Sequence, residues 1–251
     1  ISDAEREQLT RVSLEHVAGR VPVIVTISHF ATDIVVGRAQ LAKQLGAAMV
    51  MMMVPYHGAL LKGTAQQTYQ QVDAVGAVGI PIMIQDAPLS GVELPVPLLV
   101  QMAQNIEMVK LFKIECAGAA AKLRELIAAG GDAIEGPFDG EEAITLMADL
   151  DAGASGSMTS GLIPDLIGPV IRSYLAGDRQ AALHGYNRIL PIINYENRQC
   201  GFRGTKAALL AGGVIGSDFC RHPIPPLHDD TRAALLELLK MEDPLILKWG
   251  Q

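Results

Sequence analysis

Short apolar runs alternate with helical patterns along most of this chain, and this alternation limits the folds open to it. The runs lie at 21–26, 48–54, 80–85, 108–115, 133–136 and, more weakly, 153–158. A continuous apolar run is typical of a strand that is buried on both faces. One helix is expected to run through Leu41 and Leu45 and to end at Gly46. The others are expected at 2–18, 65–78, 95–104, 117–129, 141–149, 163–176, 178–197, 203–212 and 229–240. Strands that alternate with helices imply a parallel sheet covered by helices.

Six strand–helix units with short strands and polar strand ends favour an α/β fold of the (β/α)8 barrel type over a doubly wound sheet. Neither a Gly-x-Gly-x-x-Gly pattern after an early strand nor a Walker A pattern occurs. We predict a barrel over 1–162, followed by its last helix and a C-terminal helical extension over 163–251. Because six units are two fewer than eight, we expect the visible strands to be the third to eighth. The first two strands and the first helix would then precede Ile1.

Composition excludes several classes of partner. With 49% hydrophobic and 19% charged residues, the chain is typical of a soluble globular protein with a large core. The net charge of −7 argues against a nucleic-acid or anionic-membrane partner. The most apolar run, 47–55, is too short to span a bilayer. The three cysteines, an odd number far apart in sequence, fit a reducing cytoplasm.

The run 109–115 carries two ionisable residues, Lys113 and Glu115, in an otherwise apolar strand. Side chains alternate between the faces of a strand, so both residues are expected on one face, within reach of each other and of a common ligand. Burial of a lysine in apolar surroundings favours the neutral amine, which attacks a carbonyl to form a Schiff base. The alternative is a solvated Lys–Glu pair at the end of a strand.

Other polar residues gather where the predicted strands end, which in a barrel is the side of the active site. The candidates for ligand contact are Ser28, His29, Tyr56, His57, Asp86, Gly136, Asp139 and Ser157. Each has a plainer explanation: tyrosine and histidine are often structural, and Asp139 could cap a helix that starts at Glu141. Cys220, His222 and His228 have spacings that match no common zinc site, so no metal is expected.

Several motifs in this order resemble the dihydrodipicolinate synthase / N-acetylneuraminate lyase family, and within it the L-2-keto-3-deoxyarabonate dehydratase branch. The motifs are PYHG at 55–58, IMIQDAP at 82–88, FKIE at 112–115, AGAAAKLR at 117–124, EGPFDGE at 135–141 and NYENRQ at 194–199. The family's second-strand motif, which binds the keto-acid carboxylate, has no counterpart here. The loop 87–91 also lacks the arginine with which the synthase branch binds a dicarboxylate.

The resemblance implies a cytoplasmic, homotetrameric (β/α)8 barrel that uses no cofactor and acts on a small 2-keto acid, such as pyruvate or a sugar acid of pentose catabolism. Lys113 would form the Schiff base, Tyr56 would relay protons, and Glu115 would act at C3 and C4. The expected reaction converts L-2-keto-3-deoxyarabonate to 2-oxoglutarate semialdehyde. The alternatives are a retro-aldol lyase, either a 2-keto-3-deoxy acid aldolase or a dihydrodipicolinate synthase-like enzyme, and a non-catalytic sugar-acid sensor.

Overall fold

The computed structural model describes residues 1–57, 61–87, 91–92 and 94–250. The PYHG motif and the loop 87–91 therefore lie partly outside the described residues. The chain forms two compact units. Unit 1 comprises Ile1–Phe138 and Ala152–Ala154, and unit 2 comprises Asp139–Asp151 and Ser155–Gln251. The predicted domain boundary at 162–163 stays a prediction.

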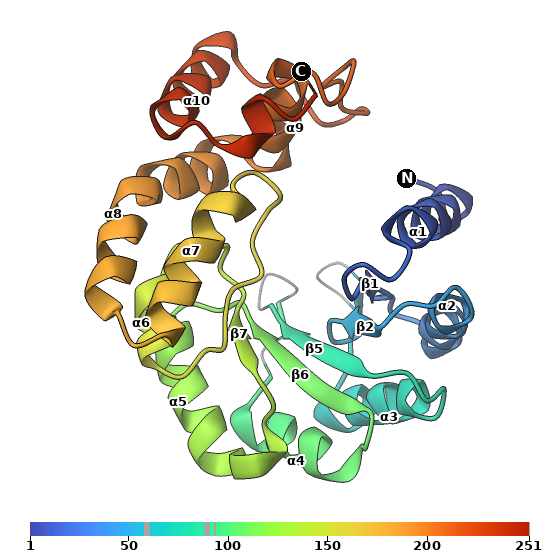
Figure 1. Ribbon diagram of the computed structural model, residues 1–251. Coiled ribbons are helices and arrows are strands. Elements are labelled where there is room, and N and C mark those ends of the chain that lie inside the picture. The colour runs from blue at the N-terminus through green and yellow to red at the C-terminus, as the bar shows by residue number, and fades with distance from the viewer. Residues whose placement is uncertain (58–60, 88–90, 93, 251) are drawn as a thin grey trace. The chain divides into compact units, whose positions relative to one another are not determined.

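A five-stranded sheet is the centre of unit 1 (Figure 1). Its strands, in spatial order, are β1 (Ile24–Thr26), β2 (Met49–Met52), β5 (Ile82–Asp86), β6 (Val109–Ile114) and β7 (Pro137–Asp139). The pairings β1–β2, β2–β5 and β5–β6 are parallel, as the alternation of strands and helices predicts. A short antiparallel hairpin of β3 (Tyr56–His57) and β4 (Leu61–Lys62) was not predicted.

The helices of unit 1 follow the predicted pattern. They are α1 (Asp3–Val17), α2 (Thr32–Gln44), α3 (Ala65–Gly76), α4 (Val96–Asn105) and α5 (Ala119–Gly130), with a 3-10 turn at Gly131–Ala133. Capping boxes begin two of them: Ser2 with Glu5 at α1, and Thr64 with Gln67 at α3. Helices α3, α4 and α5 lie along one face of β5 and β6 (Figure 1).

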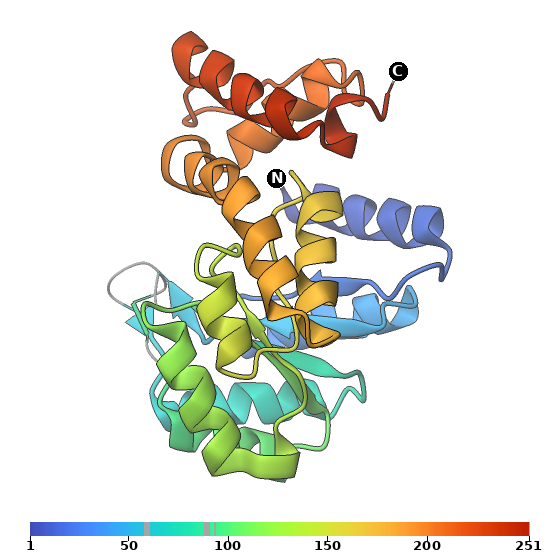
Figure 2. The same ribbon diagram turned by 60° about the vertical axis from the view of Figure 1, so that its left-hand side comes forward.

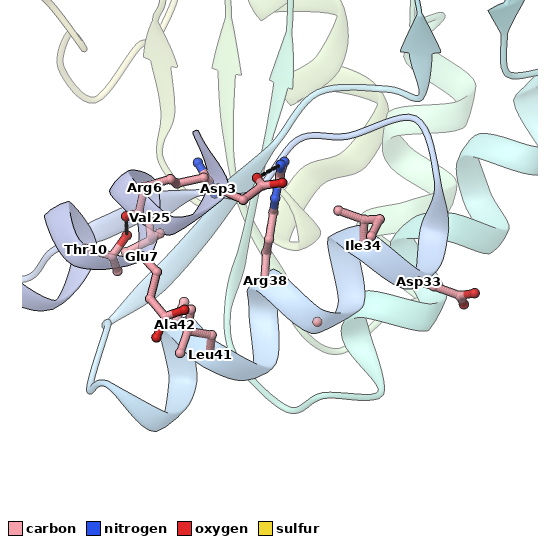
Figure 3. Close-up of a pocket in the computed structure, with 11 residues that line it drawn as sticks. Asp3, Arg6, Glu7, Thr10, Val25, Asp33, Ile34, Arg38, Leu41 and Ala42 are labelled. Atoms are coloured by element: carbon pink, nitrogen blue, oxygen red, sulfur yellow. Dashed lines mark hydrogen bonds and ion pairs between the residues drawn. The ribbon is translucent and has the colours of Figure 1, made fainter. Parts of the chain in front are cut away.

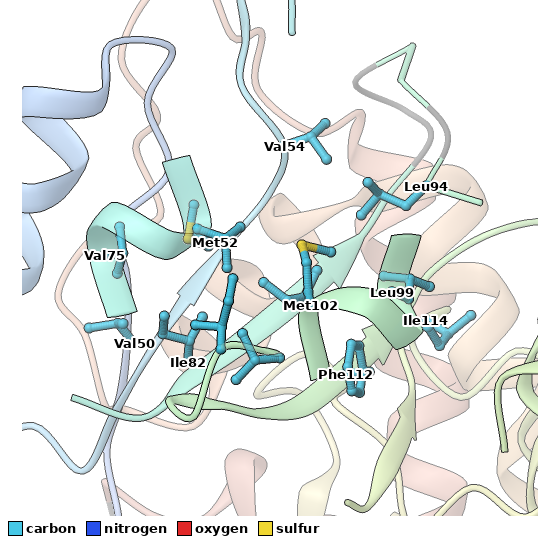
Figure 4. Packing of buried hydrophobic residues seen from close by; sticks show 14 of the residues in the cluster. Val50, Met52, Val54, Val75, Ile82, Leu94, Leu99, Met102, Phe112 and Ile114 are labelled. Atoms are coloured by element: carbon cyan, nitrogen blue, oxygen red, sulfur yellow. The ribbon is translucent and has the colours of Figure 1, made fainter. Parts of the chain in front are cut away.

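The core of unit 1 lies between this helical layer and the sheet (Figure 4). Phe112 and Ile114 of β6 are fully buried in it, together with Leu99 and Met102 of α4. Because strand side chains alternate, Lys113 between them is directed to the other face of the sheet.

The register between β5 and β6 contains one irregularity. Ile82 pairs with Val109, but the next residue, Met83, pairs with Leu111, so β6 carries one extra residue at Lys110. Beyond this bulge the pairing is regular, with Gln85 opposite Lys113 and Asp86 opposite Ile114.

Unit 2 is mainly helical. Its helices are α6 (Leu146–Asp151), α7 (Pro164–Leu175), α8 (Arg179–Tyr195), α9 (Phe202–Ala211) and α10 (Asp229–Glu242), with a π-helical turn at Glu196–Cys200 and a 3-10 turn at Leu245–Leu247. Helices α7 and α8 lie side by side (Figure 2) and share an apolar core with α9 and α10. In the part of the chain that the structure describes, no helix is long and apolar enough to cross a membrane.

Three predicted elements near the junction of the units differ from the structure. The strand predicted at 153–158 is reduced to one isolated bridge between Ser157 and Asp139. The strand predicted at 133–136 is replaced by β7 at 137–139, because a 3-10 turn occupies 131–133 and Gly136 has a positive φ of 39°. The helix predicted at 141–149 begins only at Leu146. Glu142 and Ala143 have φ values of 58° and 67°, which a helix does not allow.

Candidate functional site

Lys113 and Glu115 form the centre of the candidate site, at the C-terminal end of β6. The Nζ atom of Lys113 lies 3.0 Å from Oε2 of Glu115, and their side chains are only 10% and 19% exposed. The prediction that the two side chains share one face is confirmed. Both groups are largely shielded from water, which strengthens their mutual attraction.

Gln85 completes the cluster, and the sequence prediction missed it. Its Nε2 atom donates a 2.6 Å hydrogen bond to Oε2 of Glu115 from the neighbouring strand β5, where it pairs with Lys113. The one feature of the sequence that could have indicated Gln85 is its position, as a polar residue near the end of an apolar strand. The register that sets it opposite Lys113 depends on the bulge at Lys110.

This cluster has the parts that imine chemistry needs. A lysine amine can attack a ketone, and a carboxylate beside it can accept a proton from the adjacent carbon. Among the described residues, both contacts of the Glu115 carboxylate are made by Oε2. The Gln85 amide thus fixes the orientation of the carboxylate without adding a charge.

Asp86 lies on the opposite face of β5 from Gln85. Its carboxylate is fully buried, and Oδ2 lies 2.6 Å from Nζ of Lys122 on α5. The predicted substrate contact of Asp86 therefore gains no support, because its side chain points toward the helical layer and away from Lys113. The sequence analysis did not identify Lys122 as the partner of Asp86, because strand periodicity gives no information on contacts with a helix.

The remaining candidates of unit 1 lie near other strand ends. Ser28 follows β1, and its Oγ accepts a 3.0 Å hydrogen bond from the Met53 amide. His29 is exposed, and its Nδ1 accepts a 3.0 Å bond from the Ala31 amide. Tyr56 is half-buried and His57 exposed in β3. Within the described residues, neither of these two makes a hydrogen bond with the Lys113–Glu115 pair, so their predicted roles stay predictions.

Asp139 of unit 2 makes structural contacts. Its fully buried carboxylate accepts hydrogen bonds from the amides of Glu141 (2.8 Å) and Ala143 (3.0 Å) and from the Ser157 hydroxyl (2.5 Å). These bonds hold the turn that replaces the predicted start of a helix. Gly136 lies directly before β7, so it is at the N-terminal and not the C-terminal end of this strand. Substrate contacts of Gly136, Asp139 and Ser157 stay predictions.

A second buried acid, Asp149, lies near Asp139, and its Oδ2 accepts a 2.6 Å hydrogen bond from the Thr145 hydroxyl; it was not singled out from the sequence. Burial, together with the nearby charges of Asp139 and Glu141, raises the pKa of Asp149 to about 6. Burial also raises the pKa of Asp139. The Tyr186 hydroxyl donates to the Ile144 carbonyl at 2.5 Å, and burial beside these acids raises its pKa to about 12.

A pocket of about 280 Å³ lies between α1 and α2 (Figure 3). Arg38 of α2 points into it and pairs with Asp3 of α1 at 2.9 Å. Arg6 of α1 donates to the Thr26 carbonyl. None of the predicted site residues lines this pocket, so it is distinct from the Lys113 cluster. In the described ranges, no group of three or more His, Cys, Asp or Glu side chains could hold a metal ion.

Comparison with known proteins identifies the family to which the chain belongs. The model of the dihydrodipicolinate synthetase family matches residues 1–242. The chain is 56% identical over its whole length to L-2-keto-3-deoxyarabonate dehydratase of Azospirillum brasilense and covers 81% of that protein. It is 30% identical over 94% of its length to 4-hydroxy-tetrahydrodipicolinate synthase of Acidiphilium cryptum, of which it covers 79%.

Solved structures agree with these relatives. A dihydrodipicolinate synthetase-like protein from Pseudomonas aeruginosa has a TM-score of 0.88 and 29% identity, with 96% of this chain and 82% of that chain covered. Dihydrodipicolinate synthase from Aquifex aeolicus has the same fold, with a TM-score of 0.88, 23% identity, and 97% and 82% coverage. The predicted α/β fold of the (β/α)8 barrel class is confirmed. The chain belongs to the dihydrodipicolinate synthetase family.

Proposed function

We propose that this chain is a Schiff-base-forming dehydratase that converts L-2-keto-3-deoxyarabonate to 2-oxoglutarate semialdehyde. The observation that carries the proposal is the cluster of Lys113, Glu115 and Gln85, in which a shielded amine lies 3.0 Å from an oriented carboxylate. The 56% identity to a dehydratase of this name supports the choice of substrate. The reaction makes the chain a carbon–oxygen lyase of the class I aldolase type.

In the first stage, the neutral amine of Lys113 attacks the C2 ketone of the substrate. The carbinolamine loses water, and the resulting iminium acts as an electron sink that acidifies the C3 protons. Glu115 takes a C3 proton, and the electron pair of that C–H bond forms an enamine. Since the iminium itself accepts the electrons, the chemistry requires neither a metal nor an organic cofactor.

In the second stage, the enamine expels the C4 hydroxyl, which leaves as water with the proton that Glu115 received. The conjugated iminium then loses a C5 proton to give an enol. Protons return to C3 and C4, and the C5 enol loses its O–H proton to become the aldehyde. Water hydrolyses the iminium, which releases the semialdehyde and the free amine of Lys113. One molecule of water is lost overall.

A retro-aldol lyase is the second candidate, because the same iminium can also be cleaved between C3 and C4. The 30% identity to a 4-hydroxy-tetrahydrodipicolinate synthase favours keeping it. In that reaction a base removes the C4 hydroxyl proton instead of a C3 proton, and pyruvate leaves with an aldehyde. The Glu115 carboxylate beside Lys113 favours dehydration. A non-catalytic sugar-acid sensor would have no need for this pair.

The roles of the other predicted residues form part of the proposal. Tyr56 would relay protons during formation of the carbinolamine and the iminium. Substrate hydroxyls and the carboxylate would be held by residues from Ser28, His29, His57, Gly136, Asp139 and Ser157. We also propose a cytoplasmic homotetramer; the three cysteines, an odd number far apart in sequence, fit a reducing compartment.

The test is mass spectrometry of the chain incubated with pyruvate and borohydride, with Lys113→Ala as the control. A mass increase of one reduced pyruvate in the parent chain alone is the expected result. 2-Keto-3-deoxypentonates are then assayed for semialdehyde and for pyruvate release. Semialdehyde formation supports the dehydratase, whereas pyruvate release would identify the lyase. Ligand binding without an adduct would contradict both enzyme functions and favour the sensor.

A further inference from the structure

The carboxylate of Asp86 is fully buried at the end of β5, and its charge partner comes from the helical layer. Nζ of Lys122, on the first turn of α5, lies 2.6 Å from Asp86 Oδ2, and the Lys122 side chain is only 12% exposed. In the described residues neither atom has a hydrogen-bond partner. Oδ1 of Asp86 accepts a 3.4 Å hydrogen bond from the Leu94 amide, but among the described residues Lys122 is the one cation that pairs with this carboxylate.

Stability alone does not explain such a pair. Removing two charges from water costs several kcal/mol for each ion, and apolar residues of similar volume often stabilise a fold equally well or better. A retained buried pair next to a candidate site therefore calls for a geometric explanation. That explanation lies in what else Asp86 holds.

Asp86 is connected to Glu115 in two ways. Its carbonyl oxygen accepts a 2.9 Å hydrogen bond from the Glu115 amide. The residue immediately before it, Gln85, donates the 2.6 Å bond that orients the Glu115 carboxylate. The end of β5 thus holds both the backbone and the side chain of Glu115. The Lys122 contact ties this strand end to α5.

We infer that the Asp86–Lys122 ion pair positions Glu115 for proton transfer at C3 of the Schiff base. Asp86 and Lys122 are positioning residues, because they act on Glu115 through β5 and Gln85. The Asp86 side chain lies on the face of β5 that is turned away from Lys113, and Lys122 contacts it from α5. This inference rests on the proposed function. It concerns the proton-transfer steps, while formation of the Schiff base needs the Lys113 amine.

Pyruvate separates these two steps, because its C3 protons exchange with solvent only after the imine has formed and a base has acted. Borohydride trapping measures the imine, and NMR in D₂O measures the exchange. In Lys122→Met we expect trapping within about twofold of the parent chain and exchange slower by about 10- to 100-fold, the effect of a misplaced catalytic group. Lys248→Met is the matched control: Lys248 pairs with Asp243 at 2.6 Å at the surface, and its loss should change neither rate.

The double variant Asp86→Leu with Lys122→Met separates positioning from stability, because it leaves no unpaired buried charge. We expect its thermal stability to recover while exchange stays slow. If exchange recovers together with stability, or if trapping falls as much as exchange in both variants, the inference is wrong. A parent chain that forms no adduct would instead overturn the proposed function itself. The two failures are therefore distinguishable.

Discussion

Buried carboxylates meet different partners in the two units. In unit 1, Asp86 and Glu115 each face a lysine at 3.0 Å or less. In unit 2, the buried Asp139, Asp149 and Glu196 are surrounded by hydroxyl and amide donors. No lysine or arginine pairs with these three acids in the described part of unit 2. Burial raises the pKa of each.

The difference separates two uses of a buried acid. A carboxylate that is paired with a lysine keeps its charge and can serve as a base beside a nucleophile. A carboxylate without a cation is stabilised in its protonated form, so its contribution to stability depends on pH. We therefore expect chemistry to be disturbed by changes in the first group and stability by changes in the second.

Replacement of Lys113 should have the largest effect. Lys113→Arg keeps a positive charge for Glu115 but removes the nucleophile, so dehydration should fall by at least about 1,000-fold while the fold is retained. Turnover assays and thermal unfolding test this together. Measurable turnover with an unchanged product would show that Lys113 does not form the imine.

Glu115→Gln should come next. Loss of the base should slow dehydration by about 100- to 10,000-fold, while pyruvate is still trapped on Lys113 by borohydride. The measurements are turnover of the keto acid and mass spectrometry of the adduct. Normal turnover in this variant would show that a residue other than Glu115 removes the C3 proton.

In unit 2 the expected effect is on stability. The pKa of Asp149 rises from 3.8 to about 6 on folding, so the folded state binds the proton more tightly than the unfolded state. The corresponding stabilisation is fully present below about pH 4 and is lost as the pH rises through 6, a difference of about 3 kcal/mol. Asp149→Asn keeps a neutral side chain that can accept from Thr145 and donate to Asp139.

This variant should therefore be more stable than the parent chain at pH 8, by up to about 3 kcal/mol, and should lose the advantage toward pH 4. Urea unfolding of the whole chain at both pH values measures the difference. An advantage of equal size at the two pH values would mean that Asp149 does not carry the titration.

The smallest effect is expected at Glu196, on the π-helical turn. The Thr205 hydroxyl donates a 2.6 Å hydrogen bond to its carboxylate. Thr205→Val removes this donor and should destabilise the chain by about 1–3 kcal/mol, whereas Thr205→Ser should cost less because the hydroxyl remains. If both variants unfold at the same urea concentration, the bond contributes nothing measurable.

Sequence periodicity predicted the parts of the site that lie within one strand. Lys113 and Glu115 are two residues apart, and a period of two was enough to place them together. It could not find Gln85 or Lys122, because their contacts depend on the register of β5 against β6 and on the position of α5. No local pattern encodes these long-range relations.

Local chemistry explains the errors near Asp139. The segment Glu141-Glu142-Ala143 consists of residues with good helix propensity, which favoured the predicted helix. The Asp139 carboxylate instead takes the amides of Glu141 and Ala143, and the backbone turns with positive φ before α6 begins. The short Asp139 side chain thus accepts hydrogen bonds from the amides at the start of the predicted helix, which favours the turn over the helix.

The extra residue in β6 decides which side chains meet. If Lys110 paired regularly with Met83 and did not bulge, residue 113 would lie opposite Asp86 instead of Gln85. The lysine would then face the helical layer, and Phe112 would take its place beside Gln85. A strand of the same length that paired without the bulge would thus place a phenyl ring where the amine lies at the reaction centre. The site depends on a count of residues as much as on their kinds.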